Sequence, residues 1–136
     1  MSKNTLNIIY LNRQISILLM GWGLSSIVLG TTLIFFKNDF LKAIAFQFLL
    51  WGFIDFILGL IPIIRDKFTK RKKLYRILFF NSFLDLIYIS IAFLLIFEIF
   101  YNGEKAIGHG FGVFCQAIFL LIFDTYFGYK VFRTKD

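Results

Sequence analysis

Four long apolar segments impose the strongest constraint on how this sequence can fold. They comprise residues 15–36, 43–64, 77–101 and 107–129. A bilayer core of about 30 Å requires roughly 20 helical residues to cross it. In lipid, a single segment satisfies its own backbone hydrogen bonds only as a helix. The pattern therefore predicts an all-α integral membrane fold, with four transmembrane helices in a compact antiparallel bundle.

The composition leaves little material for any other domain. The chain has 136 residues, of which 59% are hydrophobic and 17% are charged, whereas soluble domains are nearer half apolar and about a quarter charged. We therefore expect residues 1–136 to form a single transmembrane domain. The first apolar segment exceeds the roughly 7–15 residues of a signal-peptide core, so we interpret it as a membrane helix. The single Cys115 excludes thiol oxidoreductases that need paired cysteines.

The distribution of basic residues predicts an orientation in the membrane. Residues 65–76 contain seven Lys or Arg. The same side would carry Lys3, Arg13, Lys130, Arg133 and Lys135, and the opposite side only Lys37, Lys42 and Lys105. Because positively charged loops stay cytoplasmic, we expect both termini and the basic loop 65–76 in the cytoplasm and the chain in a bacterial inner (plasma) membrane. Alternative roles for this loop are contact with anionic lipid and binding of nucleic acid; we favour orientation and expect no nucleic-acid partner.

Polar residues recur at a distance of 69 positions. The identical pairs of scarce residue types are Gln47 with Gln116, Asp55 with Asp124, Gly59 with Gly128, and Asn12 with Asn81. Such a pattern is compatible with a tandem repeat of two helical hairpins in the same orientation. Identities are few, however, and a chance likeness in a biased composition is the alternative.

Each of the last three apolar segments contains one aspartate, namely Asp55, Asp85 and Asp124. A charged side chain at the centre of a bilayer costs about 2.5–3.5 kcal/mol, so such residues usually face the bundle interior and find partners there. Counted from the predicted cytoplasmic ends, all three lie in the cytoplasmic half of the membrane. Arg13 enters the bundle from the same side.

Helical spacing places these acids on faces shared with small or polar residues. Small residues let membrane helices approach closely, and polar ones form hydrogen bonds across the contact. These faces are therefore expected to meet inside the bundle. They consist of Asn12, Ser16, Gly23 and Gly30 in the first helix, Gly52, Asp55 and Gly59 in the second, and Asn81, Asp85 and Tyr88 in the third.

The predicted result is a polar pocket that opens toward the cytoplasm. Asp55, Asp85 and Asp124 would supply negative charge, and Arg13 would be their counter-ion. The remaining candidate ligand-binding residues are Asn12, Asn81, Tyr88 and Gln116. Carboxylates held close together away from water favour a bound proton or cation over mutual repulsion. The alternative is an internal network in which Arg13 and the amides pair with the acids and fix the helix register.

Signals of catalysis are absent from the sequence. There is no His/Cys cluster with metal-site spacing, no GxSxG nucleophile motif, and no glycine-flanked aspartate motif of the membrane aspartyl proteases. We therefore expect no metal and no cofactor, and we favour a protein without enzymatic activity, with a catalytic pair of intramembrane acids as the alternative. His109 lies in the segment GHGFG, residues 108–112, which is not a phosphate loop because no Lys-Ser/Thr follows it. We interpret His109 as an interfacial residue in a flexible turn, with pH sensing as the alternative.

Several motifs resemble an uncharacterised family of small bacterial four-helix integral membrane proteins. The resemblance rests on Asn81-x2-Leu84-Asp85-x2-Tyr88, on the glycine-rich start of the fourth helix, and on Gln116-x2-Phe119-Leu120-x2-Phe123-Asp124. The first helix, with Gly21 and Gly23 around Trp22, and the stretch Trp51-Gly52-x2-Asp55 are compatible with it. It implies a four-helix membrane fold over nearly the whole chain and assigns no activity.

These observations favour a membrane protein that binds or transports a small cation, a proton or a polar solute through an acidic intramembrane pocket. Transport through so small a bundle would require a homo-oligomer. The alternative is a non-catalytic interaction protein, such as a subunit, an immunity factor or a defence factor, whose buried acids form a structural network.

Overall fold

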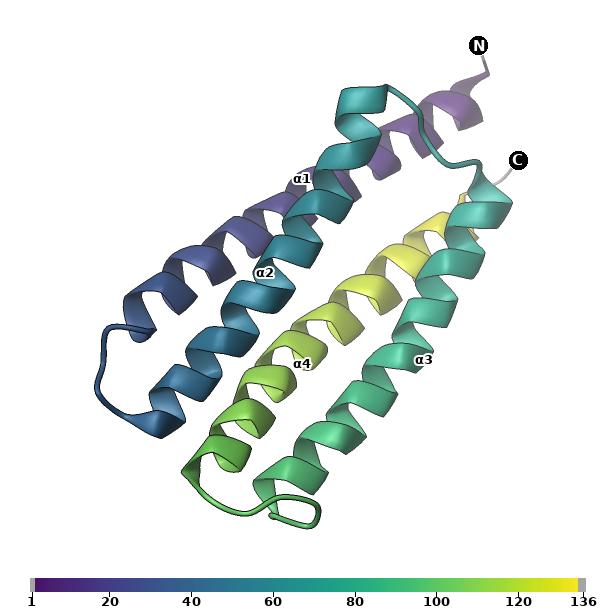
Figure 1. Cartoon of the computed structure of the whole chain (residues 1–136). Helices are drawn as coiled ribbons and strands as arrows, with labels where there is room; N and C mark the ends of the chain where they lie inside the picture. The colour runs from purple at the N-terminus through teal and green to yellow at the C-terminus, as the bar shows by residue number, and fades with distance from the viewer. Residues whose placement is uncertain (1, 135–136) are drawn as a thin grey trace.

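In the computed structural model, which describes residues 2–134, the chain forms four long helices (Figure 1). Their bounds are α1 Lys3–Leu33, α2 Asp39–Arg65, α3 Arg71–Ile96 and α4 Glu104–Arg133. Between residues 2 and 134 there is no strand, so the predicted all-helical class with four helices is confirmed. Lys135, which was expected on the cytoplasmic side, lies outside the described residues.

The helices extend beyond the apolar segments at six of the eight ends, whereas the first and the third end earlier than predicted, at Leu33 and Ile96. α3 stops at Ile96 and not at residue 101, because the chain turns at Glu98, whose φ of 55° lies in the left-handed region. The Glu98 carboxylate then accepts a hydrogen bond from the N–H of Gly103 at 2.6 Å. Gly103 itself, with a φ of 109°, precedes the first residue of α4. This acid therefore closes the loop between α3 and α4.

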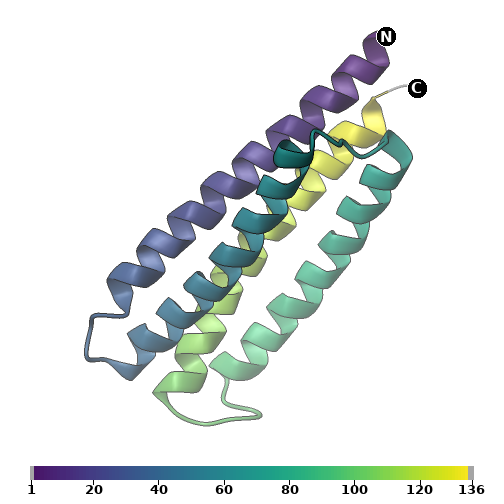
Figure 2. The ribbon, with the colours of Figure 1, turned by 45° about the horizontal axis from the view of Figure 1, so that its top comes forward.

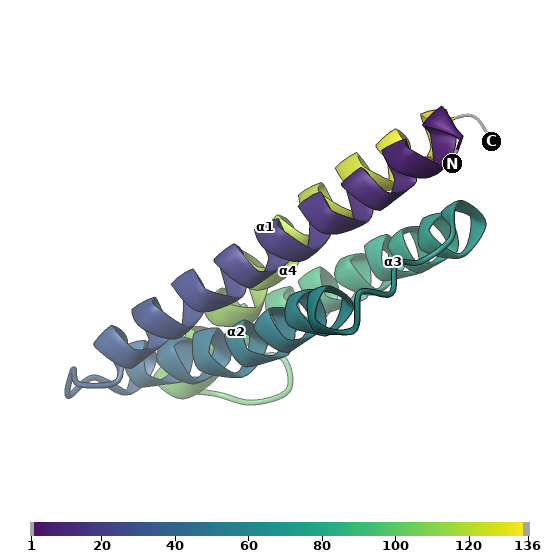
Figure 3. The ribbon, with the colours of Figure 1, turned by 90° about the horizontal axis from the view of Figure 1, so that it is seen from above.

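The bundle consists of two antiparallel hairpins joined through one pair of helices. α1 packs closely along α2, and α3 packs closely along α4. The hairpins meet mainly where α2 packs on α4, and these two helices run in the same direction (Figure 1). By contrast, α2 and α3 are consecutive in the chain but scarcely touch. The termini and the 66–70 connection lie at one end and both hairpin loops at the other (Figure 2), an arrangement also visible from above (Figure 3).

Glycines at seven-residue spacing bring α1 and α2 together. Gly23 packs on Gly52, and a Cβ at Gly23 would lie 2.5 Å from the Phe56 nitrogen and 2.6 Å from the Gly52 oxygen. A Cβ at Gly59 would lie 2.6 Å from the backbone oxygen of Ser16. Since contacts this short leave no room for a side chain, the backbones approach as closely as small residues permit. The small faces expected from the sequence are the ones in contact.

The GHGFG segment is helical and does not form the flexible turn expected from its composition. Residues 104–133 are one continuous helix. Gly108 and Gly112, one turn apart, face α2, where an added Cβ would clash with the Phe40 oxygen and the Gln47 side chain respectively. Gly110 faces α3, and a Cβ there would lie 2.9 Å from the Ala92 oxygen. These glycines let α4 pack against two helices at once.

Large apolar side chains lie outside the bundle and small or polar ones inside it. The largest fully buried side chains are Gln116, Val131 and Ser26. Phe35, Phe79 and Ile122, by contrast, are exposed by 66–80%. The apolar cluster that does form lies near the termini and is centred on Leu74, Leu78 and Phe127. All four helices are long and apolar enough to span a membrane.

Charge is separated between the two ends of the bundle. The end with the termini carries the basic residues of α1, the end of α2, the 66–70 connection, the start of α3 and the end of α4. They are Lys3, Arg13, Arg65, Lys67, Lys70, Arg71, Lys72, Lys73, Arg76, Lys130 and Arg133. The end with the hairpin loops carries Lys37, Lys42 and Lys105 together with Asp39, Glu98 and Glu104. The first end is therefore strongly positive and the second nearly neutral.

Candidate binding cavity between α2 and α3

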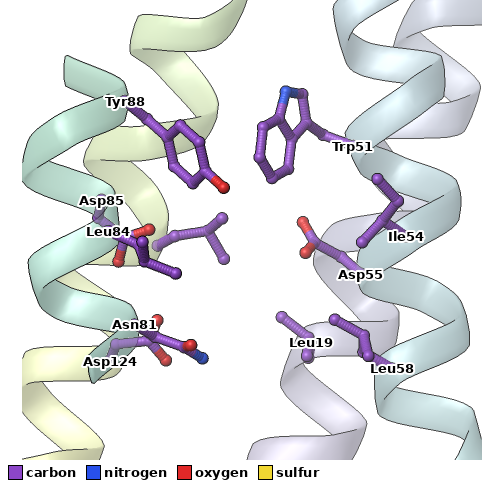
Figure 4. Close-up of a pocket in the computed structure, with 11 residues that line it drawn as sticks. Leu19, Trp51, Ile54, Asp55, Leu58, Asn81, Leu84, Asp85, Tyr88 and Asp124 are labelled. Carbon is purple, nitrogen blue, oxygen red and sulfur yellow. The ribbon is translucent and has the colours of Figure 1, made fainter. Parts of the chain in front are cut away.

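A cavity of about 230 Å³ lies where α2 and α3 fail to meet (Figure 4). α2 and α3 form its two walls, while one residue of α1 and two residues of α4 line the back. The walls carry Trp51, Ile54, Asp55 and Leu58 from α2 and Asn81, Leu84, Asp85 and Tyr88 from α3, and the back carries Leu19, Leu120 and Asp124. The cavity is thus mostly apolar with a small group of polar side chains, as binding pockets usually are.

The three aspartates of the apolar segments all line this one cavity. Asp55, Asp85 and Asp124 are exposed by only 2%, 3% and 5%. Asp55 points across the gap from α2 toward Asp85 on α3 (Figure 4). Asp55 lies inside the bundle because Gly52 and Gly59, on the same face of α2, pack against α1. The sequence placed the three acids in one pocket, and the structure brings them together.

In two of these carboxyl groups, one oxygen lacks a hydrogen-bond partner. Within residues 2–134, Oδ2 of Asp55 and Oδ2 of Asp85 are buried without any hydrogen bond. Buried polar groups are almost always paired, and an unpaired one indicates a strained site or a missing ligand. Leaving such a group unsatisfied costs about 1–3 kcal/mol, and more when it is charged. The acids therefore do not behave like parts of a satisfied structural network.

Asp85 and Asp124 form a close pair within the cavity. Their carboxyl groups are close enough to interact electrostatically, and a hydrogen bond between two carboxyls would need a proton on one of them. Asp55 lies on the opposite wall, contributed by the other hairpin. The cavity thus places a carboxyl pair opposite a single carboxyl across the gap between the hairpins.

Trp51 and Tyr88 close the gap between α2 and α3 on the side of the hairpin loops. Their ring centroids are 5.0 Å apart in an edge-to-face arrangement. The Tyr88 hydroxyl points into the cavity (Figure 4). The sequence identified Tyr88 through its spacing from Asp85, whereas Trp51 was not among the candidate site residues. Its four-residue spacing to Asp55 is the signal that places Trp51 on the same face of α2.

Other residues predicted for the pocket lie elsewhere. Arg13 is exposed on α1, makes no ion pair with the three acids among the described residues, and does not line the cavity. The Arg13 side chain therefore does not lie where a counter-ion to these acids would. Asn12 bonds to Thr69 at the end of the bundle that carries the termini. Asn81 is the one predicted amide that lines the cavity.

Gln116 belongs to a separate hydrogen-bonded network between α4 and α1. Its side-chain oxygen accepts from the Trp22 indole N–H at 2.7 Å, and its amide nitrogen donates to the Ser26 hydroxyl at 3.1 Å. The Trp22 ring also stacks on Phe119 at 3.8 Å between centroids. Gln47, at the corresponding position of the proposed repeat, bonds to His109 of α4 at 2.9 Å. Both glutamines thus link one hairpin to the other.

The donor set of the cavity is poorly suited to a bare metal ion. Among the described residues, no group of three or more His, Cys, Asp or Glu side chains is placed to hold one. Alkaline-earth cations take about six or more oxygen ligands. The helices that line the cavity are continuous, so their carbonyls are engaged in helical hydrogen bonds. The Leu58 carbonyl is an exception, because the residue four positions later is Pro62, which has no N–H to donate.

Residues 18–125 match a family of unknown function, and this range includes all three aspartates. The chain belongs to the DUF6992 family. The expected membership of an uncharacterised family is thereby confirmed. The DUF6992 match begins after Asn12 and Arg13, so it covers the cavity but not the contact between Asn12 and Thr69. No curated protein and no solved structure matches the chain.

Proposed function

We propose that this chain is a multi-pass membrane protein whose acidic cavity binds a small cation or a proton. The observation that carries the proposal is that Asp55 and Asp85, on opposite walls of the cavity, each have a buried carboxyl oxygen without a hydrogen-bond partner among the described residues. Polar groups buried in a membrane bundle are expensive and usually functional. A purely structural network would pair these oxygens, as it pairs Gln116 and Asn12.

The separation of charge supports a definite orientation. The end that carries the termini holds most of the basic residues, including those from Arg65 to Arg76. Positively charged segments remain on the cytoplasmic side of the membrane. We therefore place both termini in the cytoplasm and the chain in the plasma membrane, with the 66–70 connection available to anionic headgroups.

The division into two hairpins supports transport over static binding. The acids are contributed by both hairpins, so a relative movement of the hairpins would change their separation. α2 and α3 scarcely touch at the cavity, while α2 and α4 hold the hairpins together. Alternating access in membrane transporters commonly occurs as one bundle rocks against another. Because four helices enclose only a small path, we propose that transport takes place in a homo-oligomer.

The test is infrared spectroscopy of the protein reconstituted in lipid. Carboxyl bands would be recorded against pH and against added cations, for wild type and for Asp55→Asn, Asp85→Asn and Asp124→Asn. We expect bands that respond to pH or cations and that diminish in each variant. Asp39→Asn, which removes an exposed acid outside the cavity, is the matched control. Wild-type-minus-variant difference bands of the three cavity acids that respond to neither pH nor cations would overturn the proposal and favour the interaction protein with a structural acid network.

A further inference from the structure

We propose that the cavity between α2 and α3 takes a small organic ammonium ion. This inference rests on the proposed function and identifies the chemical class of the cation. It follows from three properties of the cavity: the placement of its acceptors, its aromatic wall and its volume.

The acceptors are few and face each other. Asp55 Oδ2 on α2 and Asp85 Oδ2 on α3 are each buried and without a hydrogen bond. A primary ammonium group carries three N–H donors that diverge from one nitrogen, so it can donate to both walls at once. The Leu58 carbonyl, deprived of its helical donor by Pro62, is a further acceptor on a residue that lines the cavity.

The aromatic wall suits an organic cation better than an inorganic one. Trp51 and Tyr88 lie beside the acids at the loop end of the cavity. A cation over an indole or phenol ring is attracted by the ring quadrupole, and the attraction grows when water is excluded. Inorganic ions instead require a shell of oxygen ligands, and no such group is formed by the described side chains.

The remaining lining is aliphatic and accommodates a hydrocarbon tail. Leu19, Ile54 and Leu84 line the cavity together with Leu120. Apolar groups of a bound amine would be buried against them, which contributes about 25 cal/mol per Å² of area removed from water. An inorganic cation gains nothing from this surface.

The volume sets an upper limit on the occupant. The cavity holds about 230 Å³, below the roughly 300–1,000 Å³ of pockets for drug-sized ligands. A short alkylammonium ion fits this space, whereas a bulky quaternary ion such as tetrabutylammonium does not. Selection by size is therefore part of the proposal and can be tested without any mutation.

The experiment is calorimetric titration of the full chain in lipid nanodiscs. The probes are methylammonium, n-butylammonium and tetrabutylammonium chlorides, with sodium, potassium and magnesium chlorides for comparison. We expect saturable binding of n-butylammonium, no binding of tetrabutylammonium, and no competition from the metal chlorides. Asp55→Asn should abolish binding. Trp51→Leu should weaken it about tenfold, while Trp51→Phe should retain most of it.

The matched control is Trp22→Phe, which changes the other tryptophan within the apolar segments, outside this cavity. Binding of n-butylammonium should be unaffected by it. Binding of a metal ion that depends on Asp55, with no response to alkylammonium ions, would overturn this inference and leave the proposed function intact. No binding of any cation by folded wild-type protein, together with wild-type-minus-variant difference bands of the cavity acids that do not respond to pH, would overturn both. Equal binding of n-butylammonium and tetrabutylammonium would also contradict a site in this cavity.

Discussion

The side-chain amide of Asn12 pairs with the backbone of Thr69 through two hydrogen bonds, one in each direction. Asn12 Nδ2 donates to the Thr69 oxygen at 3.0 Å, and Asn12 Oδ1 accepts from the Thr69 N–H at 3.0 Å. Asn12 is 6% exposed, although it lies near the end of the bundle. The contact fixes the 66–70 connection against α1 and thereby sets where α3 begins.

Replacing Asn12 with Leu should loosen this connection. The variant loses both bonds and leaves the Thr69 N–H and C=O without protein partners, which should cost about 1–2 kcal/mol of stability. The 66–70 connection contains Lys67 and Lys70, so limited trypsin digestion in detergent should cut it faster than in wild type. Asn7→Leu, at an exposed position one to two turns earlier in α1, is the control. Equal digestion rates for Asn12→Leu and wild type would contradict this role.

Two neighbouring glycines of α1 should respond very differently to one added methyl group. In Gly23→Ala the new Cβ would lie 2.5 Å from the Phe56 nitrogen, whereas at Gly21 nothing lies within 4 Å. Overpacking of this kind typically costs about 1–3 kcal/mol, and the clash is with backbone. We expect Gly23→Ala to lower the unfolding midpoint in sodium dodecyl sulfate titrations and Gly21→Ala to leave it nearly unchanged. Similar midpoints for the two variants would mean that α1 and α2 are not in close contact at Gly23.

The fold could be predicted because its determinants are periodic. The lengths of the apolar segments set the number of helices, and the spacing of Ser16, Gly23 and Gly30 marked the buried face of α1. The end of α3 was missed because Ile96–Tyr101 is apolar enough to extend a helix by hydropathy. The turn there depends on Glu98 capping Gly103, an interaction between a side chain and a single N–H that no periodic pattern records.

The candidate site could be predicted only in part, for a related reason. Spacing within one helix placed Asp85 and Tyr88 on a common face. Asp55 and Asp124 were expected inside the bundle because a charged side chain is costly in lipid. Which helix Gln116 and Arg13 would face depends on the rotation of whole helices in the bundle. Gln116 bonds to Trp22 and Ser26 of α1, and Arg13 points outward. The pairing of helices α2 and α4 determines both outcomes, and a single sequence does not specify it.

Gln116→Leu should destabilise the contact between α4 and α1 without affecting the cavity. The Trp22 N–H and the Ser26 hydroxyl would lose their partner, and hydrogen bonds between membrane helices contribute about 1–2 kcal/mol at most. Gln116→Glu keeps an acceptor for the Trp22 N–H and should be milder than Gln116→Leu. Thermal unfolding of the purified variants checks the order. Greater damage from the Glu variant would mean that burying an acid at this position costs more than the retained bond to Trp22 contributes.

The predicted orientation can be checked by labelling single cysteines in intact cells. In a Cys115→Ser background, Asn102→Cys lies in the loop between α3 and α4, and Lys67→Cys lies in the 66–70 connection; both native residues are exposed. A membrane-impermeant maleimide should label Asn102→Cys from outside and should label Lys67→Cys only after the cells are permeabilised. The opposite pattern would place the termini outside. Labelling of both positions in intact cells would contradict a fixed orientation.

Asp85 and Asp124 should show strongly non-additive effects when both are replaced. Their carboxyl groups are close enough to interact electrostatically, so each single Asn substitution already changes the interaction that the double variant changes. Residues in contact typically deviate from additivity by about 0.5–3 kcal/mol, whereas distant pairs add within about 0.3–0.5 kcal/mol. The free energy of unfolding would be measured for the two single variants and the double variant. The control is the same set of single and double variants for Asp39→Asn with Asp85→Asn. Asp39 lies in the first turn of α2 at the loop end of the bundle. Additive effects in both cycles would mean that Asp85 and Asp124 do not interact, which would contradict a carboxyl pair in the cavity.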